Sequence, residues 1–446
     1  MARPSDFAVS DDPRVQAQLD RLADLSVPQG RLGIDTIRDL LKHLGNPHRR
    51  LPPVFHVAGT NGKGSTCAFL RAGLEAAGHT VHVFTSPHLV RFNERIRIAG
   101  RLIADDLLAD LLAEVLDVAE RECIGASFFE VSTAAAFLAF TRTPADACVI
   151  EVGLGGRFDA TNVIEHPAIC GIASLGIDHE AFLLSPDDTA PADPLPRIAF
   201  EKAGIAKPGA PLVTMDYAPA MNAVIASKAV EIGSPLVRQN EHWSVEERAE
   251  GFLYRDEINS VELPNPRLPG PHQIANAGLA VAMLRHQNAV PMPESALTEA
   301  MGRASWPARL QRLKDGPLAA LMPPGTPLWL DGGHNPDAGE AIARHFARMP
   351  GRIDLVIGML ANKAPAALLE PLAGKLASIT VVPVPGHDCH GERAFADNAA
   401  GLSVQAAADV RETLSALPSR PDQIVLIAGS LYLAGVVLRE NGELPD

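Results

Sequence analysis

The sequence has few cysteines and no apolar run long enough to cross a membrane. Its 446 residues include five cysteines, which are scattered, odd in number and without a CxxC pair. Such spacing gives no disulfide framework, so we expect buried thiols in a reducing compartment. No apolar stretch reaches the roughly 18 residues that a membrane helix needs, and the first residues lack the basic-then-apolar pattern of a signal peptide. We therefore expect a cytoplasmic protein that does not bind a membrane.

Positive charge is also scarce. The chain has 39 Lys and Arg residues against 53 Asp and Glu residues, a formal net charge of −14. This balance argues against nucleic-acid binding through a broad basic face. The chain has no internal repeat and no low-complexity tract, and its length suffices for two or three globular domains. A nucleotide is itself an anion, so such a ligand would need local positive charge.

The most informative segment reads HVAGTNGKGST at residues 56–66, between an apolar run and a helix start. Glycines let a backbone approach phosphates closely, and a helix N-terminus offers unpaired N–H groups. Lys63 adds a positive charge, and Ser65 or Thr66 can face a magnesium ion. The segment differs from a standard Walker A sequence, because Gly64 separates the lysine from the serine. It predicts a phosphate-binding loop, with an ordinary glycine-rich turn as the alternative.

Short apolar runs alternate with helical patterns from residue 54 onward, after a helical stretch in residues 1–50. This alternation predicts a parallel sheet covered by helices. Strands are expected at 54–58, 81–84, 147–152, 169–172 and 211–215, and helices at 104–121, 131–140 and 273–285. A second series has strands at 328–331, 353–357, 378–382 and 423–428. We predict an N-terminal domain at 1–303, a linker at 304–309 and a smaller C-terminal domain at 310–446, with the site at the carboxyl ends of the strands of both lobes.

Polar residues follow several of these strands. Ser86 comes after the strand at 81–84 and could ligate a metal, although a Ser-Pro turn would explain it equally well. Glu151 lies near the end of the apolar run at 147–152, which is where phosphate-loop enzymes carry a magnesium ligand. His179 is a candidate ligand for a second cation, but lone histidines are more often structural.

Other motifs occupy similar positions. The segment PGPHQIANA at 269–277 predicts a capped helix start, and an amide there could read the edge of an adenine. In DGGHNP at 331–336, Asp331 could hold ribose hydroxyls and His334 could reach phosphates or a second substrate. GSLY at 429–432 follows another strand. HDCH at 387–390 looks like a metal cluster but has no partner ligands nearby in sequence, so we do not expect zinc there.

Together these motifs resemble the folylpolyglutamate synthase and dihydrofolate synthase family, a branch of the Mur ligase superfamily. The resemblance spans nearly the whole chain. Its most specific matches are GTNGKGS, TSPHL with FNERI, EVGLGGRFDATN, EKAGI, HQIANA and DGGHNP, in the family's order. It implies an α/β fold, with an N-terminal P-loop domain of the Mur ligase central type and a mostly parallel sheet. A smaller Rossmann-like α/β domain would follow it.

The resemblance also implies roles for individual residues. The phosphate cradle would consist of Gly59, Thr60, Asn61, Gly62, Lys63, Gly64, Ser65 and Thr66. Ser86 and Glu151 would hold one magnesium ion, and Glu151 with His179 a second. Further nucleotide contacts would come from Asn276, Arg309, Asp331 and His334. The substrates would contact Phe128, Phe129 and Glu130 near the pterin, and His334 and Ser430 near glutamate. The expected catalytic residues are Lys63, Lys202, His179 and Arg309, where Lys202 matches a lysine that is carbamylated in many relatives.

The implied activity is ATP-dependent ligation of L-glutamate to a pterin carboxylate through an acyl phosphate. Dihydropteroate would give dihydrofolate, and reduced folates would be extended to polyglutamates. ATP and two magnesium ions are the expected cofactors, and the partners are these small molecules, without nucleic acid or membrane. We expect a monomer. The sequence leaves open which of the two activities is present, and we expect a bifunctional enzyme of the bacterial type.

Two other functions fit parts of the pattern. A cell-wall Mur ligase carries a uridine-nucleotide domain of on the order of a hundred residues before its loop, whereas 58 residues precede Gly59 here. A P-loop ATPase or nucleotide-binding regulator without ligase activity is the second alternative. The chain also departs from the family: the segment 179–201 is longer than usual, and residues 361–364 lack two expected acids.

Overall fold

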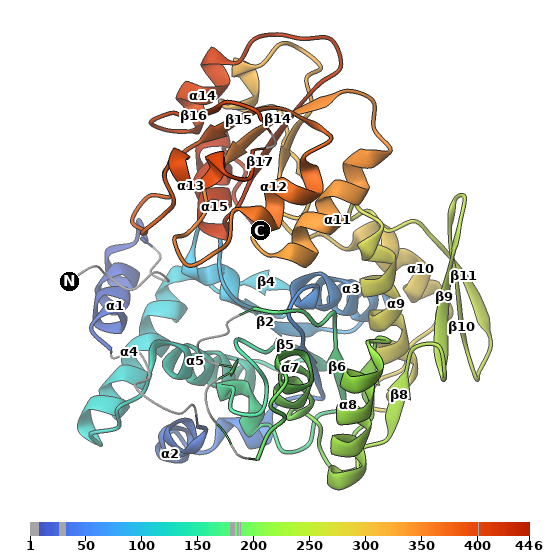
Figure 1. Ribbon diagram of the computed structural model, residues 1–446. Helices are drawn as coiled ribbons and strands as arrows, with labels where there is room; N and C mark the ends of the chain where they lie inside the picture. Colours follow the sequence, from blue (N-terminus) through green and yellow to red (C-terminus); the bar gives the residue numbers. More distant parts are fainter. Residues whose placement is uncertain (1–8, 26–32, 179–182, 185–186, 188, 400) are drawn as a thin grey trace. The chain divides into compact units, whose positions relative to one another are not determined.

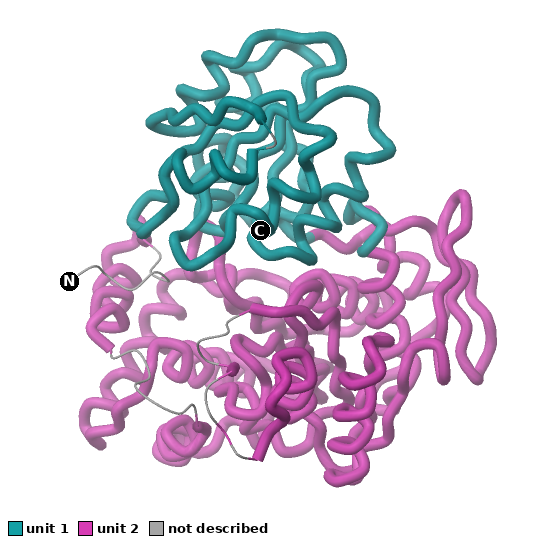
Figure 2. The backbone as a smooth tube through the Cα atoms, viewed as in Figure 1, with its two compact units in different colours: residues 1–5, 268–272, 306–446 teal, residues 6–267, 273–305 magenta. Residues whose placement is uncertain are grey.

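The computed structural model describes residues 9–25, 33–178, 183–184, 187, 189–399 and 401–446, which group into two compact units (Figure 2). Unit 2 holds the described residues of Asp6–Arg267 together with Gln273–Ser305. Unit 1 holds Leu268–His272 and Trp306–Asp446. Within the described residues, no helix combines the length and the apolar character that crossing a membrane requires. The domain limits 1–303, 304–309 and 310–446 stay predictions.

Unit 2 is built on an eight-stranded sheet with the strand order β4-β3-β2-β5-β1-β6-β7-β8 (Figure 1). The strands from β2 to β8 in this order are parallel, and β3 and β4 form an antiparallel edge. The central strands are buried along their whole length, as expected for a sheet with helices on both faces. The bounds are β1 Val54–Ala58, β2 Val81–Phe84, β3 Ile96–Ile98, β4 Arg101–Leu102, β5 Ala147–Glu151, β6 Ile169–Ile172, β7 Leu212–Thr214 and β8 Leu236–Arg238.

The helices of this unit bury their apolar residues against the sheet and against each other. One core joins α1, α2, α4 and α5 to β1, β2 and β5, and a second joins α7 and α8 to β6 and β7. The bounds are α1 Pro13–Ala23, α2 Asp35–His43, α3 Lys63–Ala76, α4 Asp105–Arg121, α5 Phe128–Arg142, α7 Pro194–Ala203, α8 Pro219–Ile232, α9 His272–Arg285 and α10 Glu294–Arg303. Short 3-10 turns occupy Pro47–Arg50, Phe92–Arg95 and Ala160–Val163.

A separate three-stranded antiparallel sheet also belongs to unit 2. Its strands are β9 Trp243–Arg248, β10 Gly251–Asp256 and β11 Ser260–Pro264, in the order β11-β10-β9. Gly251 lies where a Cβ atom would come within 2.0 Å of the Leu263 carbonyl oxygen, so this pairing requires glycine. The sequence-based expectation contained no strands in this region.

Unit 1 contains a six-stranded sheet with the order β12-β13-β17-β14-β15-β16. All neighbours are parallel except β12 and β13. The strands are β12 Gln311–Arg312, β13 Leu328–Leu330, β14 Arg352–Ile357, β15 Leu376–Val381, β16 Val404–Ala406 and β17 Gln423–Ala428. The helices are α11 Pro336–Ala347, α12 Ala366–Leu372, α13 Glu392–Ala396, α14 Val410–Ala416 and α15 Leu431–Asn441, with a 3-10 turn at Ala319–Leu321.

The predicted α/β class is confirmed in both units, and the register shows why polar residues gather at one edge. In unit 2, Val57 pairs with Glu151, Ala58 with Ile172, and Phe84 with Ile150. The carboxyl ends of β1, β2, β5 and β6 are therefore level with one another. The segments that leave these four strands begin side by side, and they include the motifs GTNGKGS, TSPHL and EVGLGGRFDATN.

Candidate active site

The segment 59–66 connects β1 to α3 at this edge. Gly62 is the N-cap residue of α3, and its φ of +81° is a conformation that glycine adopts without strain. The first N–H groups of a helix have no intrahelical partner, so this end of α3 suits an anion. The backbone N–H groups of Thr60 and Asn61 donate to the Ser174 carbonyl oxygen, at 2.8 and 3.4 Å. These two bonds fix the loop against the end of β6.

Helix α9 packs directly on the loop. A Cβ atom on Gly62 would lie 2.4 Å from Asn276 Oδ1. Asn276 Nδ2 donates to Gln273 Oε1 at 3.0 Å, and Gln273 Nε2 donates to Ser65 Oγ at 3.3 Å. The buried Thr66 hydroxyl has no hydrogen-bond partner among the residues that the structure describes. The amides of α9 therefore hold Ser65, while the Thr66 hydroxyl is not committed to another group.

Two lysines converge on one carbonyl group of the loop. Lys63 Nζ donates to the carbonyl oxygens of Gly59 and Thr60, at 3.0 and 3.2 Å. Lys202 Nζ, from the last turn of α7, donates to the same Gly59 oxygen at 2.9 Å. Burial, together with the charge of Lys63, lowers the pKa of Lys202 to about 7. The loop thus brings together one charged lysine and one that is easily deprotonated.

Glu151 lies beside Ser86 at the ends of β5 and β2. Glu151 is 4% exposed, and its Oε2 atom accepts the Ser86 backbone N–H at 3.3 Å. A carboxylate and a hydroxyl are the hard oxygen ligands that magnesium prefers, and water completes its coordination shell. These two residues therefore fit the group that the sequence predicts. No cluster of three or more His, Cys, Asp or Glu side chains suited to a metal occurs in the described part of the chain. His179 lies outside the described residues.

The predicted pterin segment begins α5. Ser127 and Glu130 form a capping box, in which Glu130 Oε2 accepts the Ser127 backbone N–H at 2.8 Å. Phe129 is half-buried, and its ring lies beside Gly153 just after β5, where a Cβ atom would come within 2.4 Å of it. The Phe128 ring is half-buried and lies under the guanidinium of Arg95 at 5.2 Å. The two aromatic residues thus adjoin the same edge, while the carboxylate of Glu130 is engaged in capping the start of α5.

In unit 1, Asp331 organises the segment that follows β13. Its carboxylate accepts the Leu310 N–H at 2.7 Å and the Gly333 N–H at 2.6 Å. Burial raises the pKa of this carboxyl, and the charge of Arg309 partly opposes the rise. Arg309 Nη1 donates to the Ala308 carbonyl oxygen at 3.0 Å. Asp331 and Arg309 are therefore close enough to interact electrostatically.

His334 and Ser430 lie on neighbouring segments of the same unit. His334 Nδ1 is 2.9 Å from the Gly332 carbonyl oxygen. A Cβ atom on Gly332 would lie 3.1 Å from Arg309 Nη1 and 2.3 Å from Leu431 Cδ2, the residue after Ser430. Ser430 is the N-cap of α15, and its hydroxyl accepts the Tyr432 N–H at 3.1 Å. The structure thus brings the predicted residues of unit 1 to the ends of the adjacent strands β13 and β17.

Comparisons with known proteins agree on one family. Residues 321–431 match the family model "Mur ligase, glutamate ligase domain". The chain is 33% identical over 423 residues to the folylpolyglutamate synthase of Lacticaseibacillus casei, covering 90% of this chain and 92% of that protein. The chain belongs to the folylpolyglutamate synthase and dihydrofolate synthase family.

Solved structures of this family superpose closely. E. coli FolC in complex with DHPP and ADP matches with a TM-score of 0.82 at 29% identity, covering 96% of this chain and 97% of that chain. The bifunctional folylpolyglutamate synthase/dihydrofolate synthase of Yersinia pestis, complexed with AMPPNP and Mn ion, also matches with a TM-score of 0.82, at 29% identity and 95% and 97% coverage. The predicted family and fold class are thereby confirmed.

Some residues of the sequence motifs shape the backbone of the site through hydrogen bonds. The Asp159 carboxylate accepts the Leu154 N–H and the Thr161 N–H, at 2.9 and 3.0 Å, and shapes the turn after β5. Sequence reasoning missed the Ser174 carbonyl, because any residue carries a carbonyl group and no side chain marks it. It also missed Gln273 as the holder of Ser65, although that glutamine lies inside a motif that had been singled out.

Proposed function

We propose that this protein is an ATP-dependent ligase that joins L-glutamate to the carboxylate of a pterin acid. The observation that carries the proposal is the phosphate loop with Lys63, Lys202, Glu151 and Ser86 grouped around it. The family relation supports the substrate class, because relatives carry the names dihydrofolate synthase and folylpolyglutamate synthase. A family structure has been solved with Mn, AMPPNP and L-glutamate bound, which supports the same set of ligands.

The chemistry requires activation, because oxide is a very poor leaving group from a carboxylate. An oxygen of the pterin carboxylate attacks the γ-phosphorus of ATP, which gives an acyl phosphate and ADP. The α-amine of glutamate then attacks the acyl carbon and loses a proton. The tetrahedral intermediate expels phosphate, and the amide remains. No nucleophilic side chain is needed, which agrees with the groups gathered at the loop.

The residues of unit 2 would bind and orient the phosphates. The N–H groups at the start of α3 would bind phosphate oxygens. The Lys63 ammonium would leave the Gly59 carbonyl oxygen and bind them too. Ser86 and Glu151 would hold one magnesium ion, and Glu151 and His179 would hold a second. These ions would offset negative charge on the phosphoryl group as it is transferred. Asn276, beside Gly62, would contact the nucleotide.

The residues of unit 1 would complete the substrate contacts. Arg309 would offset charge on the γ-phosphate, and Asp331 would hold ribose hydroxyls through the lone pairs not used by its two backbone donors. His334 and Ser430 would lie near the incoming glutamate. Phe128 and Phe129 of unit 2 would contact the pterin ring.

We also propose that Lys202 carries a carbamate. Carbon dioxide reacts with a neutral amine: the Nζ–C bond forms and the amine loses a proton. A pKa of about 7 leaves much of this amine neutral near neutral pH. Unmodified density for the side chain at full occupancy in a high-resolution map would contradict this step.

Assays with separate substrates test the function. The purified protein is incubated with ATP, magnesium and glutamate, and with either dihydropteroate or a reduced folate monoglutamate. A bifunctional enzyme, which we propose, releases ADP with both acids and only when glutamate is present. Steady ATP turnover without either acid would instead favour a P-loop ATPase. We further propose that the enzyme acts as a monomer in the cytoplasm, without nucleic acid or membrane partners.

A further inference from the structure

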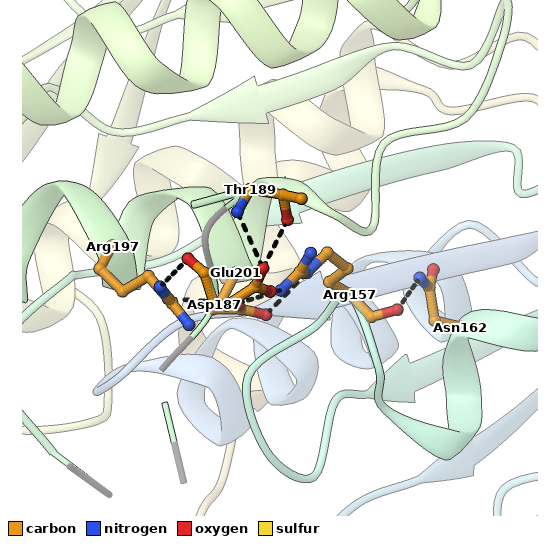
Figure 3. A network of polar contacts seen from close by, with 6 residues as sticks. All are labelled: Arg157, Asn162, Asp187, Thr189, Arg197 and Glu201. Atoms are coloured by element: carbon orange, nitrogen blue, oxygen red, sulfur yellow. Dashed lines mark hydrogen bonds and ion pairs between the residues drawn. The ribbon is translucent and has the colours of Figure 1, made fainter. Parts of the chain in front are cut away.

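Two arginines and two carboxylates form a largely buried ionic cluster in unit 2 (Figure 3). Arg157 contacts both Glu201 oxygens, with Nε at 3.1 Å and Nη2 at 2.7 Å, and its Nη2 also lies 2.5 Å from Asp187 Oδ2. Arg197 Nε lies 3.5 Å from Glu201 Oε1. The side chains of Asp187 and Glu201 are only 5% and 7% exposed. Water therefore screens this cluster less than it screens a surface ion pair.

The cluster joins three segments that are distant in sequence. Arg157 lies in the turn after β5, Glu201 on α7, and Asp187 in the segment before α7. Asp187 is itself fixed by Thr189, whose N–H and hydroxyl donate to its Oδ1 at 3.0 and 2.6 Å. The hydrogen bonds from Thr189 and the charge of Arg157 hold the pKa of Asp187 below its usual range. Asp187 is therefore an anionic partner for the arginine, with its carboxylate oriented by Thr189.

The backbones of the turn and of α7 approach each other closely at the same place. The Arg157 N–H donates to the Glu201 carbonyl oxygen at 2.8 Å. Asn162 Nδ2 donates to the carbonyl oxygens of Arg157 and Gly204, each at 3.0 Å. A Cβ atom on Gly204 would lie 2.5 Å from Arg157 Cβ. The turn and the last residues of α7 thus have little freedom to slide past each other.

Lys202 follows Glu201 directly in this clamped turn of helix. Its Nζ reaches the Gly59 carbonyl oxygen of the phosphate loop at 2.9 Å. A lysine side chain has many rotamers and does not fix its own ammonium group in place. The position of the ammonium therefore depends on the helix backbone that carries it. Displacing residue 201 would therefore displace Lys202 relative to the loop.

We propose that Arg157 is a positioning residue for Lys202, and that Asp187 and Glu201 act through it to fix the last turn of α7 against the phosphate loop. The proposal rests on the proposed function, in which Lys202 acts during phosphoryl transfer. Arg157 does not touch the substrates in this role. Asp187 contributes the second carboxylate that faces Arg157.

The test is the variant Arg157→Gln, assayed for kcat and for the KM of ATP. The wild type is assayed first, and the absence of ligase activity there would refute the proposed function without bearing on Arg157. We expect kcat to fall about ten- to hundredfold, because a displaced catalytic group costs that much, while the KM of ATP changes by less than about threefold. A crystal structure of the variant should show Lys202 Nζ moved away from the Gly59 oxygen.

Arg285→Gln is the matched control. Arg285 forms a buried bidentate pair with Asp256 in the same unit, at 2.6 and 2.9 Å, and also lies over an aromatic ring. We expect both variants to lose thermal stability, because each loses a largely buried ion pair, but only Arg157→Gln should lower kcat. Equal kcat values in the two variants would overturn the proposal.

Two milder variants keep the test decisive if Arg157→Gln does not fold. Arg157→Lys retains the charge without the bidentate geometry and should recover part of the lost kcat. Asp187→Asn keeps an acceptor for Thr189 but removes the charge facing Arg157, and should lower kcat about threefold to tenfold. Wild-type kcat in both variants would show that the cluster serves stability alone.

Discussion

At the scale of single residues, the site is organised around the carbonyl oxygen of Gly59. This atom accepts hydrogen bonds from Lys63 and from Lys202, at 3.0 and 2.9 Å. Two amines close to one another favour either an anion between them or the loss of a proton from one. Because burial lowers the pKa of Lys202, we expect the two lysines to have different roles, with Lys202 as the group that responds to pH.

Lys63→Ala should abolish both ligase activities and leave the fold intact. The lost ammonium would otherwise offset charge on the transferring phosphoryl group, so kcat/KM should fall by about a hundredfold or more. ADP release with each pterin acid measures the effect, and thermal unfolding followed by circular dichroism verifies the fold. Lys228→Ala, which removes a lysine paired with Glu231 on α8, is the control. Retention of more than a few per cent of activity would contradict the phosphate-binding role of Lys63.

Lys202 should make stability rise with pH above neutrality. Its pKa is lowered from 10.5 to about 7, so below that value both the folded and the unfolded chain hold the proton and burial costs its full amount. Between about 7 and 10.5 the folded chain releases the proton that the unfolded chain keeps, so the free energy of unfolding rises. Lys202→Met removes this dependence.

Urea unfolding in buffer freed of carbon dioxide measures the effect of Lys202→Met. At about pH 6 the variant should be more stable than the wild type by on the order of 1–3 kcal/mol. The difference should shrink steadily as the pH rises through the window. A difference that does not change with pH would show that the Lys202 amine keeps its proton in the folded protein.

At the scale of elements, the loop and the start of α3 depend on one glycine conformation. Gly62→Ala places a methyl group 2.4 Å from Asn276 Oδ1 and also strains a residue whose φ is +81°. Gly78→Ala strains a residue with a similar φ of +88° but has no atom within 4 Å of its Cβ position. Both should lose about 1–2 kcal/mol of stability to backbone strain.

Only Gly62→Ala should also weaken nucleotide binding. Because the methyl group pushes Asn276 and the loop apart, the Kd of magnesium ADP should rise at least about tenfold. Isothermal titration calorimetry of the two variants and the wild type measures it. An unchanged Kd in Gly62→Ala would separate the contact with α9 from nucleotide binding.

The central strands were predictable from sequence because they are buried along their length. Continuous apolar runs gave the bounds 54–58, 81–84, 169–172 and 423–428 as the structure has them. Helix α5 begins at Phe128 rather than at the predicted residue 131, because the Ser127–Glu130 capping box lies in a segment that was interpreted as a substrate contact. The capping box thus sets the start of α5, which the pattern of apolar residues did not determine.

The sheet of β9–β11 was missed from the sequence, although β11 alternates exposed and buried residues and the first four residues of β10 are buried. In β9, Trp243 is buried and the strand ends in three exposed residues, so its pattern follows neither a buried strand nor a regular alternation. The short antiparallel strand β3 likewise depends on pairing with β2, and β4 depends on pairing with β3. At the site, the motifs identified the types of residue. They did not identify the hydrogen-bond and ion-pair partners, because contacts such as Arg157–Asp187 join segments that are distant in sequence.

At the scale of the whole molecule, each unit carries part of the proposed machinery. Unit 2 supplies the phosphate loop, Glu151 and Lys202, and unit 1 supplies Arg309 and Asp331. The Mur ligase glutamate ligase match falls within unit 1, at residues 321–431. We expect the same ATP-dependent activation to serve dihydropteroate and folate substrates. The two differ in how the substrate carboxylic acid binds.

The central claim is that the carboxylate is activated as an acyl phosphate before glutamate attacks. The most direct test is a turnover with a pterin acid whose carboxylate carries heavy oxygen, followed by mass spectrometry of the released phosphate. Our account predicts that one labelled oxygen passes from the acid to each inorganic phosphate. Released phosphate without label, while the amide product forms normally, would contradict it.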